Sequence, residues 1–444
     1  MQTNFSDAQL SDPAIQVADS ILRSCVHCGF CTATCPSFVT VGDEDDSPRG
    51  RIYLIKEMLE SGAAASAPVA FHLDRCLSCL SCMTTCPSGV DYMHLIDHAR
   101  THVEETYRRP WHDRALRAVL AAILPYPQRM RWALRAAGLA RPFAALIPQR
   151  GALLARLRAM LALSASERVV AEGPDVTVQA VHPAVGARRG RVLLLAGCAQ
   201  RVLDPGIHAA TVRLLNRLGV EVVIPQAAGC CGALTHHLGK HAAFVAQAGA
   251  TIKAMAAALD EPTDAIIINT SGCGTVVKDY GFALRGEEAD LAAKAATISA
   301  LAMDVAEYLV KIGYQRTRPE SGLTIAYHAA CSLQHGQKIT DAPKKLLRQA
   351  GFRVVEPRDA HLCCGSAGTY NILQPEIATS LRARKLDTLT SLSPDAIAAG
   401  NIGCLTQLAG AGIPTIHTIE LLDWMAGGPC PAGLKREINI GLDR

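Results

Sequence analysis

The chain has 444 residues, of which 49% are apolar and 19% charged, so it can bury two or three cores and is too apolar to be largely disordered. No apolar run approaches the roughly 18 residues that span a bilayer, and the polar stretch 1–8 lacks the features of a signal peptide. The net charge is only +4. Seventeen cysteines without an export signal favour a cytoplasmic, reducing setting and metal ligation over disulfides.

The N-terminal region contains one cysteine pattern twice, C-x₂-C-x₂-C-x₃-C-P, at a constant offset of 51 residues. This is the spacing of two-cluster bacterial ferredoxins, in which the fourth cysteine of each run ligates the other cluster. Zinc, the alternative, usually takes pairs of cysteines and would leave the third cysteine of each run without a role. The pattern therefore predicts two [4Fe–4S] clusters, the first held by Cys25, Cys28, Cys31 and Cys86 and the second by Cys35, Cys76, Cys79 and Cys82.

Two charged segments lie close to these cysteine runs. The acidic stretch 43–46 falls in a predicted loop and is expected to be solvated charge. Residues 100–160 hold twelve arginines against three acidic residues, interleaved with apolar positions, which predicts a basic amphipathic helical hairpin broken at Pro125, Pro127 and Pro142. Such a hairpin fits an anionic membrane face or an acidic partner, and it equally fits a connector with a solvated arginine face. Nucleic-acid binding is disfavoured, because no aromatic-studded basic platform accompanies the arginines.

Past a linker rich in Gly, Pro, Ala and Ser at about 164–189, short β-branched runs alternate with amphipathic stretches. Strands are predicted at 191–196, 221–225, 265–269, 325–327, 353–355 and 395–398. Helices are predicted at 205–218, 240–259, 341–350 and 375–389, with Gly219 and Gly351 as C-terminal stops. This repeated βαβ pattern predicts two α/β domains with parallel sheets.

Each α/β domain carries four cysteines, related by an offset of 133 residues for the first three and 131 for the last. The leading and trailing cysteines follow predicted strands, so we expect them at the carboxyl ends of the strands, where open α/β sheets bind ligands. The duplication also predicts that the cysteine loops of both halves converge about a pseudo-twofold axis. The glycine after each Cys-Cys pair allows the sharp bend that such a pair needs. Four thiolates per half predict a further iron–sulfur cluster or a zinc ion, with reactive dithiols and buried structural cysteines as alternatives. The two sets are Cys198, Cys230, Cys231 and Cys273, and Cys331, Cys363, Cys364 and Cys404.

Several familiar site signatures are missing. No dinucleotide fingerprint, Walker loop or Ser/His/Asp arrangement is present, so no catalytic residue is assigned and the chain has no evident means of taking a hydride. Its clusters would move single electrons, and a partner must perform the two-electron chemistry. The histidines near the cysteine loops are not assigned as ligands, because a lone histidine more often satisfies a backbone carbonyl. They are His236, His237, His328, His335 and His361.

The predicted fold class is a multi-domain α+β chain, in which a helical ferredoxin-type domain precedes two duplicated α/β domains with Cys-Cys-Gly (CCG) motifs. The expected divisions are 1–105 for the ferredoxin-type domain, 106–189 for the basic connector and linker, and 190–318 and 319–444 for the CCG domains.

These motifs resemble the iron–sulfur subunits of bacterial glycolate oxidases. The resemblance rests on SILRSCVHCGFCTATCP, SPRGRIYLIKEMLE, LDRCLSC, SCMTTCPSGV, AGCCGA, SGCG and HLCCGSAGTYN. It implies a subunit of a membrane-associated oxidoreductase complex in which flavin-containing subunits, carrying FAD, oxidise glycolate to glyoxylate. This chain would pass their electrons toward a membrane acceptor such as a quinone, from the inner face of the cell membrane. The eight N-terminal cysteines match the family's cluster ligands.

Related families leave alternatives open. Paired CCG domains also occur in iron–sulfur subunits of D-lactate and glycerol-3-phosphate dehydrogenases and in heterodisulfide reductase, a thiol/disulfide reductase. The last family has a fifth cysteine three residues after the trailing one. Here Val276 and Gln407 stand at those positions, which puts disulfide-reducing chemistry in doubt and leaves a cluster or a zinc ion in each half.

Overall fold

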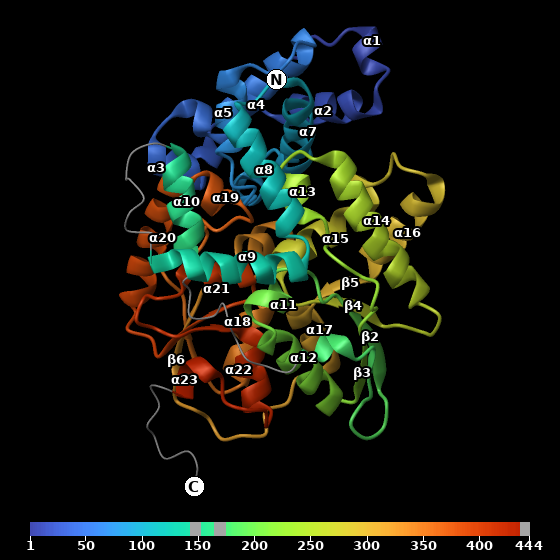
Figure 1. The fold of residues 1–444 in the computed structure, drawn as a ribbon, viewed down its shortest axis with the longest axis vertical. Helices are drawn as coiled ribbons and strands as arrows, with labels where there is room; N and C mark the ends of the chain where they lie inside the picture. Colours follow the sequence, from blue (N-terminus) through green and yellow to red (C-terminus); the bar gives the residue numbers. More distant parts are fainter. Residues whose placement is uncertain (143–151, 164–174, 436–444) are drawn as a thin grey trace.

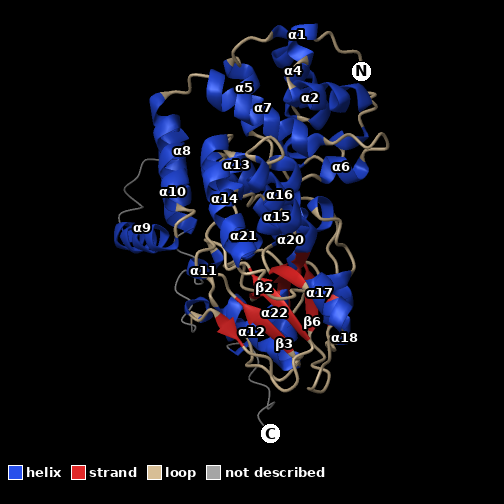
Figure 2. Ribbon diagram, turned by 90° about the vertical axis from the view of Figure 1, so that its right-hand side faces the viewer, coloured by secondary structure: helices blue, strands red, loops and turns tan. Residues whose placement is uncertain are grey.

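The structure, a computed structural model, describes residues 1–142, 152–163 and 175–435. A helical N-terminal region lies at one end of the molecule, and two α/β units with central sheets occupy the middle and the other end (Figures 1 and 2). This arrangement confirms the predicted fold class. The first part of the predicted linker, residues 164–174, and residues 143–151 of the predicted connector lie outside the described residues.

The N-terminal region is built from short helices around one apolar core. Leu22, Ile55, Leu73 and Leu95 come from four different helices and are fully buried together. Ser47 begins one of these helices by accepting a hydrogen bond from the backbone N–H of Gly50. The helices are α1 (Asp7–Leu10), α2 (Pro13–Ser24), α3 (Pro36–Val41), α4 (Pro48–Ser61), α5 (Ala67–Asp74), α6 (Ser81–Thr85) and α7 (Tyr92–Thr106), with 3₁₀ turns η1 (Phe30–Thr32) and η2 (Glu44–Asp46).

The basic segment forms the predicted helical hairpin, α8 (Trp111–Ile123) and α9 (Pro127–Ala140), followed by α10 (Ala152–Leu163). Helix α9 begins at Pro127, as expected for a proline that fits only the first turn of a helix. The arginines are not uniformly solvated. Arg109 and Arg117 are buried and both pair with Asp74 of α5, which fixes α8 to the N-terminal region.

The first α/β unit is a five-stranded sheet in the order β1-β3-β2-β4-β5, parallel except for β1. The strands are β1 (Val181–His182), β2 (Gly190–Leu194), β3 (Val220–Val223), β4 (Ala265–Ile268) and β5 (Ala302–Asp304). The helices are α11 (Gln200–Leu203), α12 (Gly206–Arg217), α13 (Ala233–His237), α14 (His241–Ala257), α15 (Ser271–Ala283), α16 (Ala289–Leu301) and α17 (Val305–Ile312), with η4 (Val176–Val178) before β1.

The second unit repeats this topology with a parallel sheet in the order β7-β6-β8-β9. The order matches β3-β2-β4-β5 strand for strand, which confirms the predicted duplication. The strands are β6 (Thr324–Tyr327), β7 (Arg353–Val355), β8 (Ala396–Ala399) and β9 (Thr415–His417). The helices are α18 (Ala342–Gln349), α19 (Tyr370–Leu373), α20 (Pro375–Thr390), α21 (Ile402–Leu408), α22 (Thr418–Met425) and α23 (Ala432–Lys435), with a π-helical turn η5 (Ser332–Gly336).

The two units share one apolar core, to which strands and helices of both contribute buried side chains. Helix α12 packs against α22 across this boundary. Asp423 of α22 is buried and accepts hydrogen bonds from Arg213 and Arg217 of α12 at 2.6 Å each. The two halves are therefore joined by both apolar packing and a buried carboxylate.

The N-terminal region docks on both units. His94 of α7 lies between Asp91 (2.6 Å) and Asp279 of α15 (2.9 Å) and stacks on Phe282. Tyr370 of the second unit donates a hydrogen bond from its hydroxyl to the carbonyl of Arg75 in the N-terminal region. In the part of the chain that the structure describes, no helix combines the length and apolarity required to cross a membrane.

The His94 contact predicts a dependence of stability on pH. Burial opposes the charged imidazole, but Asp279 and Asp91 outweigh it and raise the pKa of His94 from 6.5 to about 9. Because the pKa is raised in the folded state, charged His94 contributes its full stabilisation below pH 6.5. This stabilisation is lost as the pH rises through 9. Between pH 7 and 10 we expect the free energy of unfolding of the wild type to fall by about 1 to 2 kcal/mol more than that of His94→Gln, after allowance for partial solvent screening. Urea unfolding of both proteins at each pH measures this difference, and equal losses would contradict it.

Candidate metal centres

The first cysteine group lies in the loops that follow α2 and α6. Its four members, together with Cys82, line one small cavity of about 30 Å³. The loop turns tightly, with positive φ angles at His27 and Gly29. Burial, ahead of the neighbouring thiols, raises the pKa of Cys31 to about 11. A thiol of this kind is a poor free nucleophile, whereas a metal centre would supply the positive charge that favours its thiolate. The members are Cys25, Cys28, Cys31 and Cys86.

The second cysteine group is buried throughout and consists of Cys35, Cys76, Cys79 and Cys82. Burial, then Cys76, Cys35 and Cys31 in turn, raises the pKa of Cys82. The Tyr92 hydroxyl points to Cys76 Sγ at 3.7 Å, and Ser37 Oγ lies 3.3 Å from Cys35 Sγ. Clustered buried thiols with hydroxyl groups beside their sulfurs fit an iron–sulfur centre, whose potential depends on the polar groups around it.

A buried ion-pair network lies next to the second group. It shows that one residue of the acidic stretch 43–46, Asp46, is not solvated, whereas residues 43–45 are exposed as expected. Asp46 is 0% exposed, and its carboxylate binds Arg51 (3.1 Å), Arg75 (2.7 Å) and His72 (3.2 Å). The guanidinium of Arg51, 1% exposed, also reaches to 3.9 Å from Cys35 Sγ. The prediction was wrong for Asp46 because its partners lie 5, 26 and 29 residues further along the chain.

The first CCG set lies at the carboxyl ends of its strands, as expected. Cys198 follows β2, the Cys230–Cys231 pair follows β3, and Cys273 begins α15 after β4. Gly232 has φ +82°, and a Cβ there would lie 2.7 Å from the Phe244 ring, so only glycine fits the bend. Interaction with the Cys230 thiol, followed by burial, raises the pKa of Cys198, which shows that the two sulfurs are neighbours.

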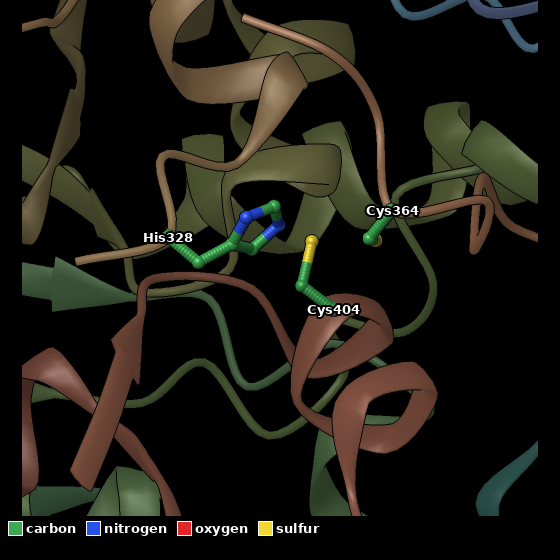
Figure 3. A group of neighbouring side chains, drawn as sticks. All are labelled: His328, Cys364 and Cys404. Atoms are coloured by element: carbon green, nitrogen blue, oxygen red, sulfur yellow. The ribbon is translucent and has the colours of Figure 1, made fainter. Parts of the chain in front are cut away.

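The second CCG set has the same placement after its strands. Cys331 Sγ lies 3.8 Å from Cys363 Sγ. Gly365 has φ +89°, and a Cβ there would lie 2.6 Å from the carbonyl oxygen of Ala378. The sulfurs of the remaining two cysteines, Cys364 and Cys404, lie within 4.8 Å of a ring nitrogen of His328 (Figure 3).

All eight CCG cysteines line a single cavity of about 350 Å³ between the two units. The loops of the halves therefore converge, as the duplication predicts. Apolar side chains of α8, α9 and α10 form another wall, including Leu120, Met130 and Met160. The apolar face of the hairpin thus covers the cavity, a role that the sequence did not indicate.

The second cysteine group adjoins this cavity. Cys79 and Cys363 belong to one buried apolar cluster with Leu77 and Tyr370, and Cys331 packs against it. Burial and then the proximity of Cys363 raise the pKa of Cys79. Thr84 and His335 form a further contact across the same boundary at 2.8 Å. His335 also approaches the carbonyl of His361 at 2.9 Å, which is the structural role expected for a lone histidine.

Comparison with known proteins agrees with this division. Residues 21–90 match the family of 4Fe-4S dicluster domains, and residues 192–278 and 325–409 match the cysteine-rich domain family twice. The dicluster domain implies two [4Fe–4S] clusters, as predicted. A solved structure of a hypothetical protein from Helicobacter pylori has a TM-score of 0.55 over 97% of this chain and 75% of its own, at 9% identity, which shows a similar fold.

Two of the relatives are similar over nearly the whole chain. The glycolate oxidase iron-sulfur subunit of Escherichia coli (strain K12) is 42% identical over 425 residues, 95% of this chain and 98% of that protein. A probable glycolate oxidase iron-sulfur subunit of Bacillus subtilis (strain 168) is 29% identical over 91% of this chain and 94% of its own. Lactate utilization protein A of Macrococcus caseolyticus is 26% identical over 52% of this chain and 96% of its own. The chain therefore belongs to the family of glycolate oxidase iron–sulfur subunits.

Proposed function

We propose that this subunit carries electrons from flavin-containing partners, which oxidise glycolate to glyoxylate, toward a membrane acceptor. The single observation that supports this most strongly is the similarity to the Escherichia coli subunit over nearly the whole chain. When bound, [4Fe–4S] clusters supply one-electron transfer, so the two-electron oxidation and its FAD belong on the partners.

The proposed ligands follow the crossed pattern of the sequence. Cys25, Cys28 and Cys31 gather around one cavity together with Cys86 from the other run, which supports the first set. Cys35 supplies the corresponding fourth thiolate of the second set, and its sulfur lies beside the Arg51 guanidinium. The second set is completed by Cys76, Cys79 and Cys82.

The proposed direction is from the first set to the second and then to the cavity between the CCG halves. Cys28 is exposed, so a flavin subunit could approach the first set. The second set is buried, and Cys79 shares a buried cluster with Cys363 of the cavity wall. We propose that electrons leave the chain at this cavity. Further metal centres at the CCG cysteines, a cluster or a zinc ion in each half, would line its wall.

The proposed location is the cytoplasmic face of the membrane, with a quinone as acceptor. Helix α9 lies across one face of the molecule (Figure 1) and carries outward-facing Trp132 (67% exposed) and Leu139 (80% exposed). Arg135 stacks over the Trp132 ring, so basic and aromatic groups stand together on this surface. Such a surface suits the interface of an anionic bilayer.

Co-expression with its flavin subunits tests the proposal. We expect the assembled complex to reduce an artificial acceptor with glycolate and to sediment partly with membranes. In the flavin subunits alone, glycolate should still reduce the flavin, but the rate of acceptor reduction should be at least about tenfold lower. D-Lactate and glycerol 3-phosphate serve as competing substrates in the same assay. Faster turnover with either one, or no association with flavin subunits, would contradict the proposal.

A further inference from the structure

A histidine that directly follows β6 has a fully buried ring. The backbone N–H of His328 donates to the carbonyl of Ala398 at 2.8 Å, which fixes its position across the β6–β8 pair. The residue is 1% exposed, and neither ring nitrogen has a hydrogen-bond partner among the described residues. Leaving a buried polar group unsatisfied is costly, so a ring held in this way points to a ligand that its nitrogen would bind.

Two thiols face this ring. A ring nitrogen of His328 and the sulfurs of Cys364 and Cys404 all lie within 4.8 Å of one another. They come from three loops, after β6, after β7 and at the start of α21, and Figure 3 shows the imidazole and the Cys404 sulfur directed toward each other. A tetrahedral zinc ion with bonds of about 2.0 to 2.3 Å holds its ligand atoms roughly 3.4 to 3.8 Å apart. The set therefore needs only a small contraction to hold one ion.

The surroundings of the set also suit a metal ion. Asn401 Nδ2 lies 3.5 Å from Cys404 Sγ and so stabilises a thiolate from outside the ligand set. A cubane, in contrast, binds each of its four thiolates to a different iron and would keep its ligands farther apart.

The first half lacks this arrangement. The offset of 133 residues that relates Cys331 to Cys198 places Leu195, a buried apolar residue, where the second half has His328. His208 of the first half instead lies 3.2 Å from the Asn269 amide. Among the residues that the structure describes, no group of three ligand atoms this close forms around the first CCG set.

We propose that the second CCG half binds one zinc ion through His328, Cys364 and Cys404, and that the first half does not. This inference rests on the metal binding proposed above for the CCG halves and makes the two halves chemically different. Zinc has no redox chemistry, so this centre would brace the cavity wall rather than pass electrons.

Metal analysis of the anaerobically purified full-length chain tests the inference. We expect about one zinc per chain, with X-ray absorption at the zinc edge showing both nitrogen and sulfur ligands. His328→Leu, which copies the residue of the first half, should lower the zinc content at least tenfold and leave the N-terminal cluster signals unchanged. His328→Cys should keep zinc with sulfur ligands only, and His361→Asn, a nearby histidine outside the set, should keep the wild-type site.

Three outcomes would overturn the inference: no zinc in wild type, zinc retained in His328→Leu, or iron in place of zinc at this half. The N-terminal cluster signals are measured in the same samples. If these signals are absent in the wild-type protein, the proposed electron-transfer function is refuted. If they are present but zinc is absent, only the zinc centre is refuted. His328→Cys keeps the test decisive if the leucine variant does not fold.

Discussion

Replacement of Cys28 by serine is expected to reduce glycolate-dependent dye reduction by the assembled complex to below about 5% of the wild-type rate, because the first cluster loses a ligand. Flavin reduction by glycolate should continue, since the substrate is oxidised on another subunit. Cys28 is exposed, so the substitution leaves the buried core of the N-terminal region in place. Stopped-flow absorbance of the flavin and steady-state dye reduction measure the two steps separately.

The matched control is Cys430→Ser, which changes a cysteine outside every predicted group and should keep both activities. Loss of flavin reduction in Cys28→Ser would contradict a purely downstream role for this chain. Unchanged dye reduction would mean that electrons reach the dye without passing the first cluster.

Removal of the Arg51 charge is expected to have the largest effect on stability. Arg51→Met leaves Asp46, 0% exposed, with fewer cationic partners, and breaking a buried ion pair from one side costs about 3 to 5 kcal/mol. The same substitution removes a positive charge near Cys35 Sγ, at 3.9 Å in the wild type. A reduced cluster carries one more negative charge, so the potential of the second cluster should fall by on the order of 100 mV.

Arg51→Lys keeps the charge but not the forked geometry, so it should lose stability while retaining most of the potential. Thermal unfolding and an EPR-monitored redox titration give the two quantities independently. A potential within about 20 mV of wild type in Arg51→Met would show that this guanidinium does not tune the cluster.

Much of the fold follows from local sequence patterns. The alternation of β-branched runs and amphipathic stretches located six of the strands and four of the helices that connect them. The strands that it missed, β1, β5 and β9, are two or three residues long. None of the three contains two consecutive Val or Ile residues, which mark the equally short β7, and only pairing with β3, β4 and β8 defines them.

The site was predictable where spacing carries the information. Repeated cysteine intervals indicated the two N-terminal groups and the convergence of the CCG loops. Asp46 and His328 could not be interpreted in this way, because their surroundings come from distant residues that only the fold brings together. A signal for His328 was nonetheless present, since the 133-residue offset pairs it with Leu195 and breaks the symmetry of the repeat.

The central claim is that eight N-terminal cysteines hold two [4Fe–4S] clusters with crossed fourth ligands. Low-temperature EPR of the anaerobically purified, dithionite-reduced chain, combined with iron analysis, tests it most directly. We expect at least about eight irons per chain and two interacting cluster signals, with Cys86→Ser removing the first and Cys35→Ser the second. A folded, active preparation without iron, or both variants losing the same signal, would contradict the account.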